Sequence, residues 1–292
     1  MSLLDDGQTS PPDATVYVVG AGVDPARHLT IEALEVLGDC KEIWTNVPET
    51  VFRRLPESLA SAVRSLKPFY KDNQTRRQNY ADVTRHILAR AAELGAVAYF
   101  TQGHPVIFDS VAANLYTGGD RQGIRVDVIG GISSIDTVLL DVLFDPGGGL
   151  QIFEATSFVY NKLKFDTRAA LLLFQPSVFG MRTPRLTANA PQPNLTDLRD
   201  ALLAHYPPNH IATFVRSATS FNPPFKIGVE IGALDTVAPS ATLASSLFIA
   251  PLRESRPPAN AEASDRGRVF DRPADRVRDA PRRDVPQGEG AT

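Results

Sequence analysis

The sequence predicts an α/β protein with two lobes: a mostly parallel N-terminal lobe and a mixed, largely antiparallel C-terminal lobe. In the first half, a short apolar run rich in β-branched and aromatic residues ends in a glycine-containing loop three times, and helical periodicity follows each time. This alternation favours parallel strands joined by helices. The second half instead has short apolar runs on either side of proline-rich turns, a pattern typical of antiparallel strands. At 292 residues, the chain is long enough for two lobes.

The three strand–loop–helix units of the first half are expected to place their loops together. The strands and the loops that follow them are 15–19 with 20–22, 97–100 with 101–108, and 125–129 with 130–134. The first loop lacks the third glycine of a dinucleotide-binding fingerprint and has Pro25 in the turn, so we reject a nicotinamide site there. Loops that follow parallel strands gather at the carboxyl edge of the sheet, where ligands bind.

One stretch of the first lobe combines a helix with two phenols and a guanidinium. Apolar residues recur at three and four positions over residues 80–94, which predicts an amphipathic helix that ends at Gly95 as its C-cap. The candidate N-cap residues are Asp72, Asn73 and Thr75. Arg76 and Tyr80 are four residues apart and share one helix face. Tyr70 lies in the preceding loop and can fold back over that face.

The remaining segments complete the expected organisation. Further helices are expected at 29–37, 48–66 (one helix or two), 109–115, 135–143 and 194–203, with an irregular or helical stretch at 156–164. Further strands are expected at 41–44, 150–153, 170–174, 211–215, 226–231 and 247–249. The domains are then a flexible leader (1–13), an N-terminal lobe (14–131), a C-terminal lobe (132–251) and a tail (252–292). The tail is rich in arginine, acidic residues and proline, with too little apolar surface to offset ordering entropy, so we expect disorder.

Composition excludes several classes of function. The net charge of −3 gives no electrostatic case for nucleic-acid binding. The single cysteine, Cys40, excludes an internal disulfide framework and is expected to be buried. No apolar run approaches the ~18 residues of a membrane span, and the acidic N-terminus is no signal peptide. The five histidines show no ligand spacing, so no metal site is expected. We expect a soluble, cytoplasmic protein without a membrane partner.

The three loops carry a resemblance to a known family. The sequence resembles the tetrapyrrole (corrin/porphyrin) methylase superfamily, whose members use S-adenosylmethionine, in the segments VYVVGAGVDPARHLT, YFTQGHPVIF and VIGGISS. The two-lobed fold of that family would cover roughly residues 14–251.

A departure from the family pattern points to one branch. The second motif is usually Gly-Asp-Pro, whereas residues 103–105 read Gly-His-Pro, which resembles the borosin branch, the omphalotin-type peptide backbone α-N-methyltransferases. That branch carries a tyrosine, an arginine six residues later and a tyrosine four residues after that. Tyr70, Arg76 and Tyr80 match this pattern, and similarity continues through LFDPGGGL, FEATSF and LLLFQPSVFG.

The resemblance implies an S-adenosylmethionine site at the gathered loops, with S-adenosylhomocysteine as the product. The lining residues carried over are Gln102, His104, Ile107, Phe108, Ser133, Ser134, Gln175, Ser217, Ala218 and Ser246, with looser agreement around the last three. Backbone groups of Ile107 and Phe108 would hold the amino-acid end, and Ser133 or Ser134 would donate a hydroxyl. The alternative roles are helix capping for the two serines and a turn position for His104.

The candidate catalytic residues suit the chemistry that the resemblance implies. An amide nitrogen is a poor nucleophile because its lone pair is delocalised into the carbonyl. A free tyrosine has a pKa of about 10, and a neighbouring arginine favours the phenolate. Arg76 can act in this way or donate to the developing oxyanion. One phenol would take the amide proton and the other would bind the amide oxygen. The position of Tyr70 in a loop favours it as the base, although Tyr80 remains an alternative. No metal is needed.

The expected substrate is a peptide. In fungal members of the branch it is fused to the C-terminus of the enzyme, whereas the tail here contains no hydrophobic run. We therefore expect a separate precursor peptide, bound in trans and methylated at several backbone positions, and the resemblance implies a homodimer. One alternative is a tetrapyrrole C-methyltransferase, whose carboxylate-rich substrate should prefer a basic cleft that the sequence does not suggest. The other is an inactive module that binds a peptide or S-adenosylmethionine.

Overall fold

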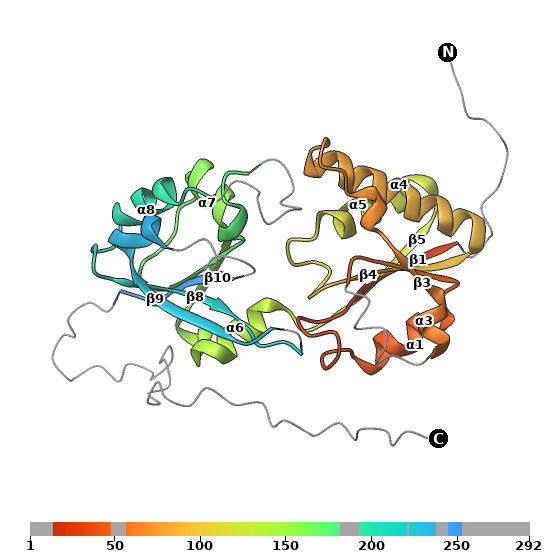
Figure 1. Cartoon of the computed structure of the whole chain (residues 1–292), viewed down its shortest axis with the longest axis horizontal. Coiled ribbons are helices and arrows are strands. Elements are labelled where there is room, and N and C mark those ends of the chain that lie inside the picture. The colour runs from red at the N-terminus through yellow and green to blue at the C-terminus, as the bar shows by residue number, and fades with distance from the viewer. Residues whose placement is uncertain (1–13, 48–56, 182–192, 221, 238–244, 253–292) are drawn as a thin grey trace, which may run out of the picture.

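Two lobes lie side by side, each built on a five-stranded sheet (Figure 1). The computed structural model describes residues 14–47, 57–181, 193–220, 222–237 and 245–252. The expected leader (1–13) and almost all of the expected tail lie outside these residues. The first sheet is wholly parallel and the second is mixed, so the predicted fold class is confirmed.

The first sheet has the strand order β3-β2-β4-β1-β5. Its strands are β1 (Thr15–Gly20), β2 (Glu42–Thr45), β3 (Val63–Ser65), β4 (Ala96–Thr101) and β5 (Arg125–Ile129). Strand β3 corrects the prediction of helix up to residue 66. The helix over this region, α3 (Glu57–Ala62), ends before Val63, which pairs with Ile43 of β2. A three-residue edge strand takes its conformation from its neighbour, which local sequence does not reveal. Residues 48–56 lie outside the described chain.

Helices cover both faces of this sheet. The helices α1 (Ile31–Asp39) and α3 lie on one face, and α4 (Arg76–Leu94) and α5 (Ser110–Gln122) lie on the other (Figure 1). Of the three candidate caps, Thr75 is the N-cap of α4. Its hydroxyl accepts from the Gln78 N–H at 3.3 Å, and the Gln78 side chain accepts from the Thr75 N–H at 2.8 Å. Gly95 ends the helix with a φ of 92°, as predicted.

Helix α5 extends well beyond the predicted end at residue 115. It continues through Gly118 and Gly119, which weaken a helix on propensity alone. A Cβ at Gly119 would lie 2.4 Å from Cγ2 of Val126, and one at Gly118 would lie 2.9 Å from Cδ1 of Leu88. The two glycines therefore let α5 pack closely on β5 and α4, and this packing outweighs their low propensity.

The second sheet has the order β6-β7-β10-β8-β9. Its strands are β6 (Leu150–Glu154), β7 (Ala170–Phe174), β8 (Ile211–Arg216), β9 (Phe225–Glu230) and β10 (Ser246–Ile249). The pair β6–β7 is parallel and the other pairs are antiparallel. Helix α6 (Ser134–Val142) covers one face, and α7 (Ala155–Tyr160) and α8 (Thr196–Leu203) cover the other (Figure 1). The helix was expected to start at Asn194, but α8 begins two residues later, at Thr196. The side chain of Asn194 accepts from the Thr196 N–H.

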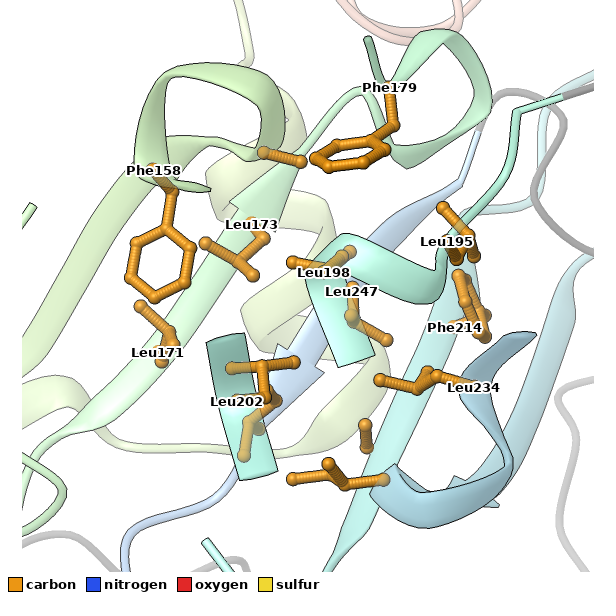
Figure 2. Packing of buried hydrophobic residues seen from close by; sticks show 14 of the residues in the cluster. Phe158, Leu171, Leu173, Phe179, Leu195, Leu198, Leu202, Phe214, Leu234 and Leu247 are labelled. Carbon is orange, nitrogen blue, oxygen red and sulfur yellow. The ribbon is translucent and has the colours of Figure 1, made fainter. Parts of the chain in front are cut away.

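The core of the second lobe lies between α8 and the sheet. Leu198 and Leu202 are four residues apart on one face of α8, and both are fully buried. Figure 2 shows them in one cluster with side chains of β7, β8 and β10, among them Leu173, Phe214 and Leu247. Burial of this apolar surface holds the sheet and α8 together.

Truncation of this cluster should be costly. We expect Leu198→Ala to lower the free energy of unfolding by about 2–5 kcal/mol, because it leaves a cavity among fully buried side chains. Leu140→Ala on α6 is the control, since Leu140 is 64% exposed and its truncation should change little. Denaturant titration followed by circular dichroism measures both, and equal effects would contradict this account of the core.

Candidate functional site

The three loops after β1, β4 and β5 meet at the carboxyl edge of the first sheet. Strand β1 lies between β4 and β5, and all three are parallel. The N–H of Gly22 donates to the carbonyl of Gly103 at 3.1 Å, and the N–H of Gly103 donates back at 2.9 Å. A Cβ at Gly131 would lie 2.6 Å from the Gly103 carbonyl oxygen and 2.8 Å from that of Gly20. The predicted gathering of the loops is confirmed, and at Gly131 it depends on the absence of a Cβ.

Three predicted cofactor residues of the second lobe lie along one edge of its sheet. Gln175 directly follows β7, Ser217 directly follows β8, and Ser246 is the first residue of β10. Because β10 lies between β7 and β8 and runs antiparallel to both, these three positions are neighbours.

This edge is joined to the first lobe by contacts at three points. Oδ2 of Asp24 accepts from the N–H and the hydroxyl of Ser220, each at 2.8 Å, and Asp24 is only 1% exposed. The rings of Phe108 and Phe174 lie 5.1 Å apart. Nη2 of Arg76 donates to the backbone carbonyl of residue 181 at 2.8 Å. The candidate cofactor residues of the two lobes therefore face a common junction.

Two predicted cofactor residues have left-handed backbone conformations. Phe108 has a φ of 54° and Gln175 a φ of 59°, which are uncommon for residues with a side chain. Such strain costs of order 1–3 kcal/mol and clusters at functional sites. Within the same loop, the Ile107 N–H donates to the carbonyl of His104, and Nδ1 of His104 accepts from the N–H of Val106. His104 is therefore built into the turn, the alternative role that the sequence left open.

The predicted serines have internal partners. Ser133 is the N-cap of α6; its hydroxyl donates to Oδ2 of Asp136 at 2.7 Å and accepts from the Asp136 N–H, so capping is its observed role. The Ser217 hydroxyl donates to Oδ2 of Asp141 at 2.5 Å. Both hydroxyls donate to carboxylates of the protein, so each could only accept a hydrogen bond from a ligand.

The other residues predicted to bind the cofactor lie as follows: Ser134 is half-buried at the start of α6, Gln102 is exposed and donates to the Val23 carbonyl, Ala218 is exposed, and Ser246 is buried.

The two candidate tyrosines are in contact. Tyr70 follows the short 3-10 helix η1 (Lys67–Phe69), and its ring lies 6.2 Å from that of Tyr80 in an edge-to-face arrangement. Buried Asn79 makes two 3.2 Å hydrogen bonds to the backbone of Lys71. Asn79 thus folds the loop back over α4, as expected for Tyr70. Its role joins residues eight positions apart, and sequence reasoning missed it.

Burial raises the pKa of both phenols above the ordinary value of a tyrosine. The pKa of Tyr70 is raised to about 12 by burial, with further increases from Tyr80 and Asp109, against a hydrogen bond to Asn46 that lowers it. The pKa of Tyr80 is also raised by burial, although the charge of Arg76 acts to lower it. The expected effect of the arginine falls on Tyr80: the charge of Arg76 lowers the pKa of that phenol, but burial raises it by more.

Asp109 is a further residue of the site that sequence reasoning missed. It is the N-cap of α5, and its Oδ1 accepts from the N–H groups of Val111 and Ala112 at 2.9 and 3.0 Å. Oδ2 accepts from the hydroxyls of Thr101 at 2.6 Å and Tyr99 at 3.1 Å. The sequence signals a helix start here, but the contacts with β4 depend on the fold. Asp109 thus connects Tyr99 and Thr101 of β4 to the first turn of α5, directly after Phe108.

Other reactive groups do not form a second site in the described chain. Cys40 is buried and donates to the Val36 carbonyl, and burial raises its thiol pKa to about 12. Among residues 14–252, outside the gaps stated above, no three His, Cys, Asp or Glu side chains are placed to hold a metal ion. Within the same residues, no helix has the length and apolar character needed to cross a membrane.

Comparison with protein families and curated proteins gives consistent matches. The family described as Tetrapyrrole (Corrin/Porphyrin) Methylases matches residues 15–224. Proteins named as methyltransferase and ribosomally synthesized borosin cyclic peptide precursor are similar. The type I protein of Coprinopsis marcescibilis is 23% identical over 212 residues, 70% of this chain and 53% of that protein. The type II protein of Phlebiopsis gigantea is 22% identical over 169 residues, 57% of this chain and 30% of that protein.

The omphalotin A precursor of Omphalotus olearius, also named a methyltransferase, is 21% identical over 175 residues. That match covers 59% of this chain and 42% of the omphalotin protein. The chain thus spans between 30% and 53% of the length of these three relatives.

Solved structures show the same fold. A cobalt precorrin-4 methyltransferase is 12% identical with a TM-score of 0.58, over 81% of this chain and 95% of its own. A uroporphyrin-III C-methyltransferase from Thermus thermophilus is 20% identical with a TM-score of 0.52, over 80% and 91%. A structure of the Thermus thermophilus protein in complex with S-adenosylhomocysteine has a TM-score of 0.50 at 16% identity, over 80% and 91%.

A methyl group at the point where the loops meet should disturb the site. We expect Gly131→Ala to lower the free energy of unfolding by about 1–3 kcal/mol, because its Cβ would overlap backbone oxygens that cannot move aside alone. Gly38→Ala is the matched control, since a Cβ there meets nothing within 4 Å inside α1, and alanine favours the helix. Thermal and denaturant unfolding compare the two, and a stable Gly131→Ala protein would refute the close approach.

The raised pKa of Tyr70 predicts a pH dependence of stability. Between about pH 10 and pH 12 the unfolded chain loses this phenolic proton while the folded chain keeps it, so stability falls as pH rises through that window. Tyr70→Phe lacks this contribution and should lose about 1–2 kcal/mol less free energy of unfolding over the same interval. Denaturant titrations at pH 9.5 to 12 measure the difference, and identical slopes for both proteins would count against a buried Tyr70 phenol.

Proposed function

Because the chain belongs to the tetrapyrrole (corrin/porphyrin) methylase family, we propose that it is an S-adenosylmethionine-dependent methyltransferase that α-N-methylates backbone amides of a peptide. The observation that carries the proposal is the contact between Tyr70 and Tyr80 beside Asp109, directly after the loop that lines the candidate cofactor site. This contact supports a site in which both phenols and Arg76 act on an amide next to the methyl donor.

The residues at the lobe junction fit S-adenosylmethionine. The loops after β1, β4 and β5 approach one another through glycine backbone, which leaves peptide groups rather than side chains facing a ligand. The residues that would hold it are Gln102, His104, Ile107, Phe108, Ser134 and Gln175. When bound, S-adenosylmethionine supplies an electrophilic methyl group. The protein contributes position, hydrogen bonds and exclusion of water.

Arg76 is suited to bind an amide oxygen. In the free chain its guanidinium already donates to a backbone carbonyl, at residue 181. A substrate peptide offers the same chemical group, so the carbonyl of the reacting amide can replace the internal one. A donor at this oxygen stabilises the negative charge that forms when the amide nitrogen loses its proton.

The two phenols take different roles. Tyr70, with a pKa of about 12, keeps its proton and donates a hydrogen bond to the amide oxygen. The positive charge of Arg76 lowers the pKa of Tyr80, which partly offsets the increase that burial causes. Tyr80 is therefore the phenol that accepts the amide proton, once it has released its own proton to solvent. The nitrogen lone pair would then form the new N–CH₃ bond as the S–CH₃ bond of the donor breaks and leaves its electron pair on sulfur.

The proposed substrate is an extended peptide presented in trans to a homodimer and methylated at several positions. The relatives named as borosin precursors support a peptide substrate. Extended peptides are usually held by main-chain contacts, with pockets for alternate side chains.

A tetrapyrrole C-methyltransferase is the second candidate, and the named functions of the structural neighbours favour it. The test incubates the protein with labelled S-adenosylmethionine and either an apolar peptide encoded beside its gene or a uroporphyrinogen, with intact-mass detection. Stepwise single-methyl gains on the peptide support our proposal. Gains on the tetrapyrrole alone, or binding of the cofactor without transfer to either, would reject it.

Substitution of the catalytic residues separates chemistry from cofactor binding. We expect Tyr80→Phe and Arg76→Ala each to reduce peptide methylation at least about 100-fold, because a proton acceptor or an oxyanion donor is lost. Affinity for S-adenosylhomocysteine should change little. Arg77→Ala is the matched control, since Arg77 is the exposed next residue of α4. Single-turnover assays and calorimetry measure both quantities, and a near-wild-type rate for Tyr80→Phe or Arg76→Ala would disprove the assignment.

A further inference from the structure

Asp109 is a partly buried carboxylate whose charge has no cationic partner in the described chain. Four neutral groups donate to its two oxygens: the hydroxyls of Tyr99 and Thr101 and the N–H groups of Val111 and Ala112. The ion pairs among the described residues do not include it. The N-terminus of α5 offers a partial positive charge, worth about half an elementary charge. A negative charge therefore remains at the lobe junction.

The charge of Asp109 acts on the groups where the reaction is proposed to occur. It raises the pKa of Tyr99 on β4, which donates to it, and acts through space to raise the pKa of Tyr70, directly after η1, and of Tyr80 on α4. Among the described residues, Arg76 also acts on Tyr80, and its effect on the pKa of Tyr80 opposes that of Asp109. In surroundings of low polarity such charges interact more strongly than they do in water.

We infer that Asp109 is the counter-charge for the cationic sulfonium of the methyl donor, and that it lets the site distinguish the charged donor from the neutral product. The inference rests on the proposed function, which places the sulfonium methyl group beside Tyr70 and Tyr80. It adds a residue that determines specificity for the donor without taking part in proton transfer.

Loss of the sulfonium charge during the reaction would weaken the binding of the product. When the methyl group moves to the amide nitrogen, the S–CH₃ bond breaks and its electron pair stays on sulfur, which becomes a neutral thioether. The attraction to Asp109 is then lost, whereas the contacts with the rest of the nucleoside remain. Product would leave more readily than donor, which suits an enzyme that must exchange its cofactor between successive methylations.

Asp109→Asn removes the charge and retains most of the local structure. Asparagine is as good an N-cap as aspartate, so its amide oxygen can still accept from the first turn of α5. Its NH₂ group would face the hydroxyls of Thr101 and Tyr99, which can rotate to accept. The variant is therefore expected to fold, and its effects report the charge.

The experiment measures the affinities of the full chain for S-adenosylmethionine and for S-adenosylhomocysteine by calorimetry. We expect Asp109→Asn to weaken the binding of S-adenosylmethionine about tenfold and that of S-adenosylhomocysteine less than about twofold. Asp120→Asn, which removes an exposed carboxylate near the other end of α5, is the control and should alter neither affinity.

Equal loss of both affinities, or no loss of either, would overturn the inference and leave the proposed function intact. A wild-type chain that binds neither compound would instead contradict the proposed function. Asp109→Glu provides a second measurement if the asparagine variant fails to fold. It keeps the charge and should keep the preference for the charged donor; equal binding of donor and product by this variant would also overturn the inference.

Discussion

The close approach of three backbone segments at the carboxyl edge of the first sheet is the constraint on which the rest of the site depends. The parallel order β4-β1-β5 brings Gly20, Gly103 and Gly131 together. A Cβ at Gly20 or at Gly131 would overlap the carbonyl oxygen of Gly103, so these two positions require glycine, and Gly103 itself has a φ of 80°. The meeting point then fixes where the loop after β4 leads, and thus where Phe108 and Asp109 lie.

The second lobe and α4 complete the site from two other directions. Buried Asp24 joins the first loop to Ser220, which sets the edge of the second sheet against the gathered loops. The capping box at Thr75 fixes the first residue of α4, so that Arg76 projects toward the second lobe, where it reaches a backbone carbonyl. The arrangement joins a proposed cofactor surface to a group that binds amide oxygens.

Local signals predicted much of the fold, and long-range contacts account for the rest. The strands β5 and β7 and the end of α4 at Gly95 follow from apolar runs and a cap, and they were predicted correctly. The strand β3 and the full length of α5 depend on neighbouring elements and were missed. In the site, motif spacing indicated Tyr70, Arg76 and Tyr80, whereas the raised pKa values of the two phenols depend on burial, which local sequence does not reveal. Asn79 and Asp109 act across separate segments, which no local pattern reveals.

The most direct test of the account is a crystal structure of the protein with S-adenosylhomocysteine and a substrate peptide. We expect the homocysteine sulfur to lie at the lobe junction, facing the amide nitrogen of the peptide. Arg76 should have exchanged the internal carbonyl for the oxygen of that amide, with both phenols in reach. A nucleoside bound elsewhere, or a peptide amide far from Tyr70 and Tyr80, would rule out the proposed site.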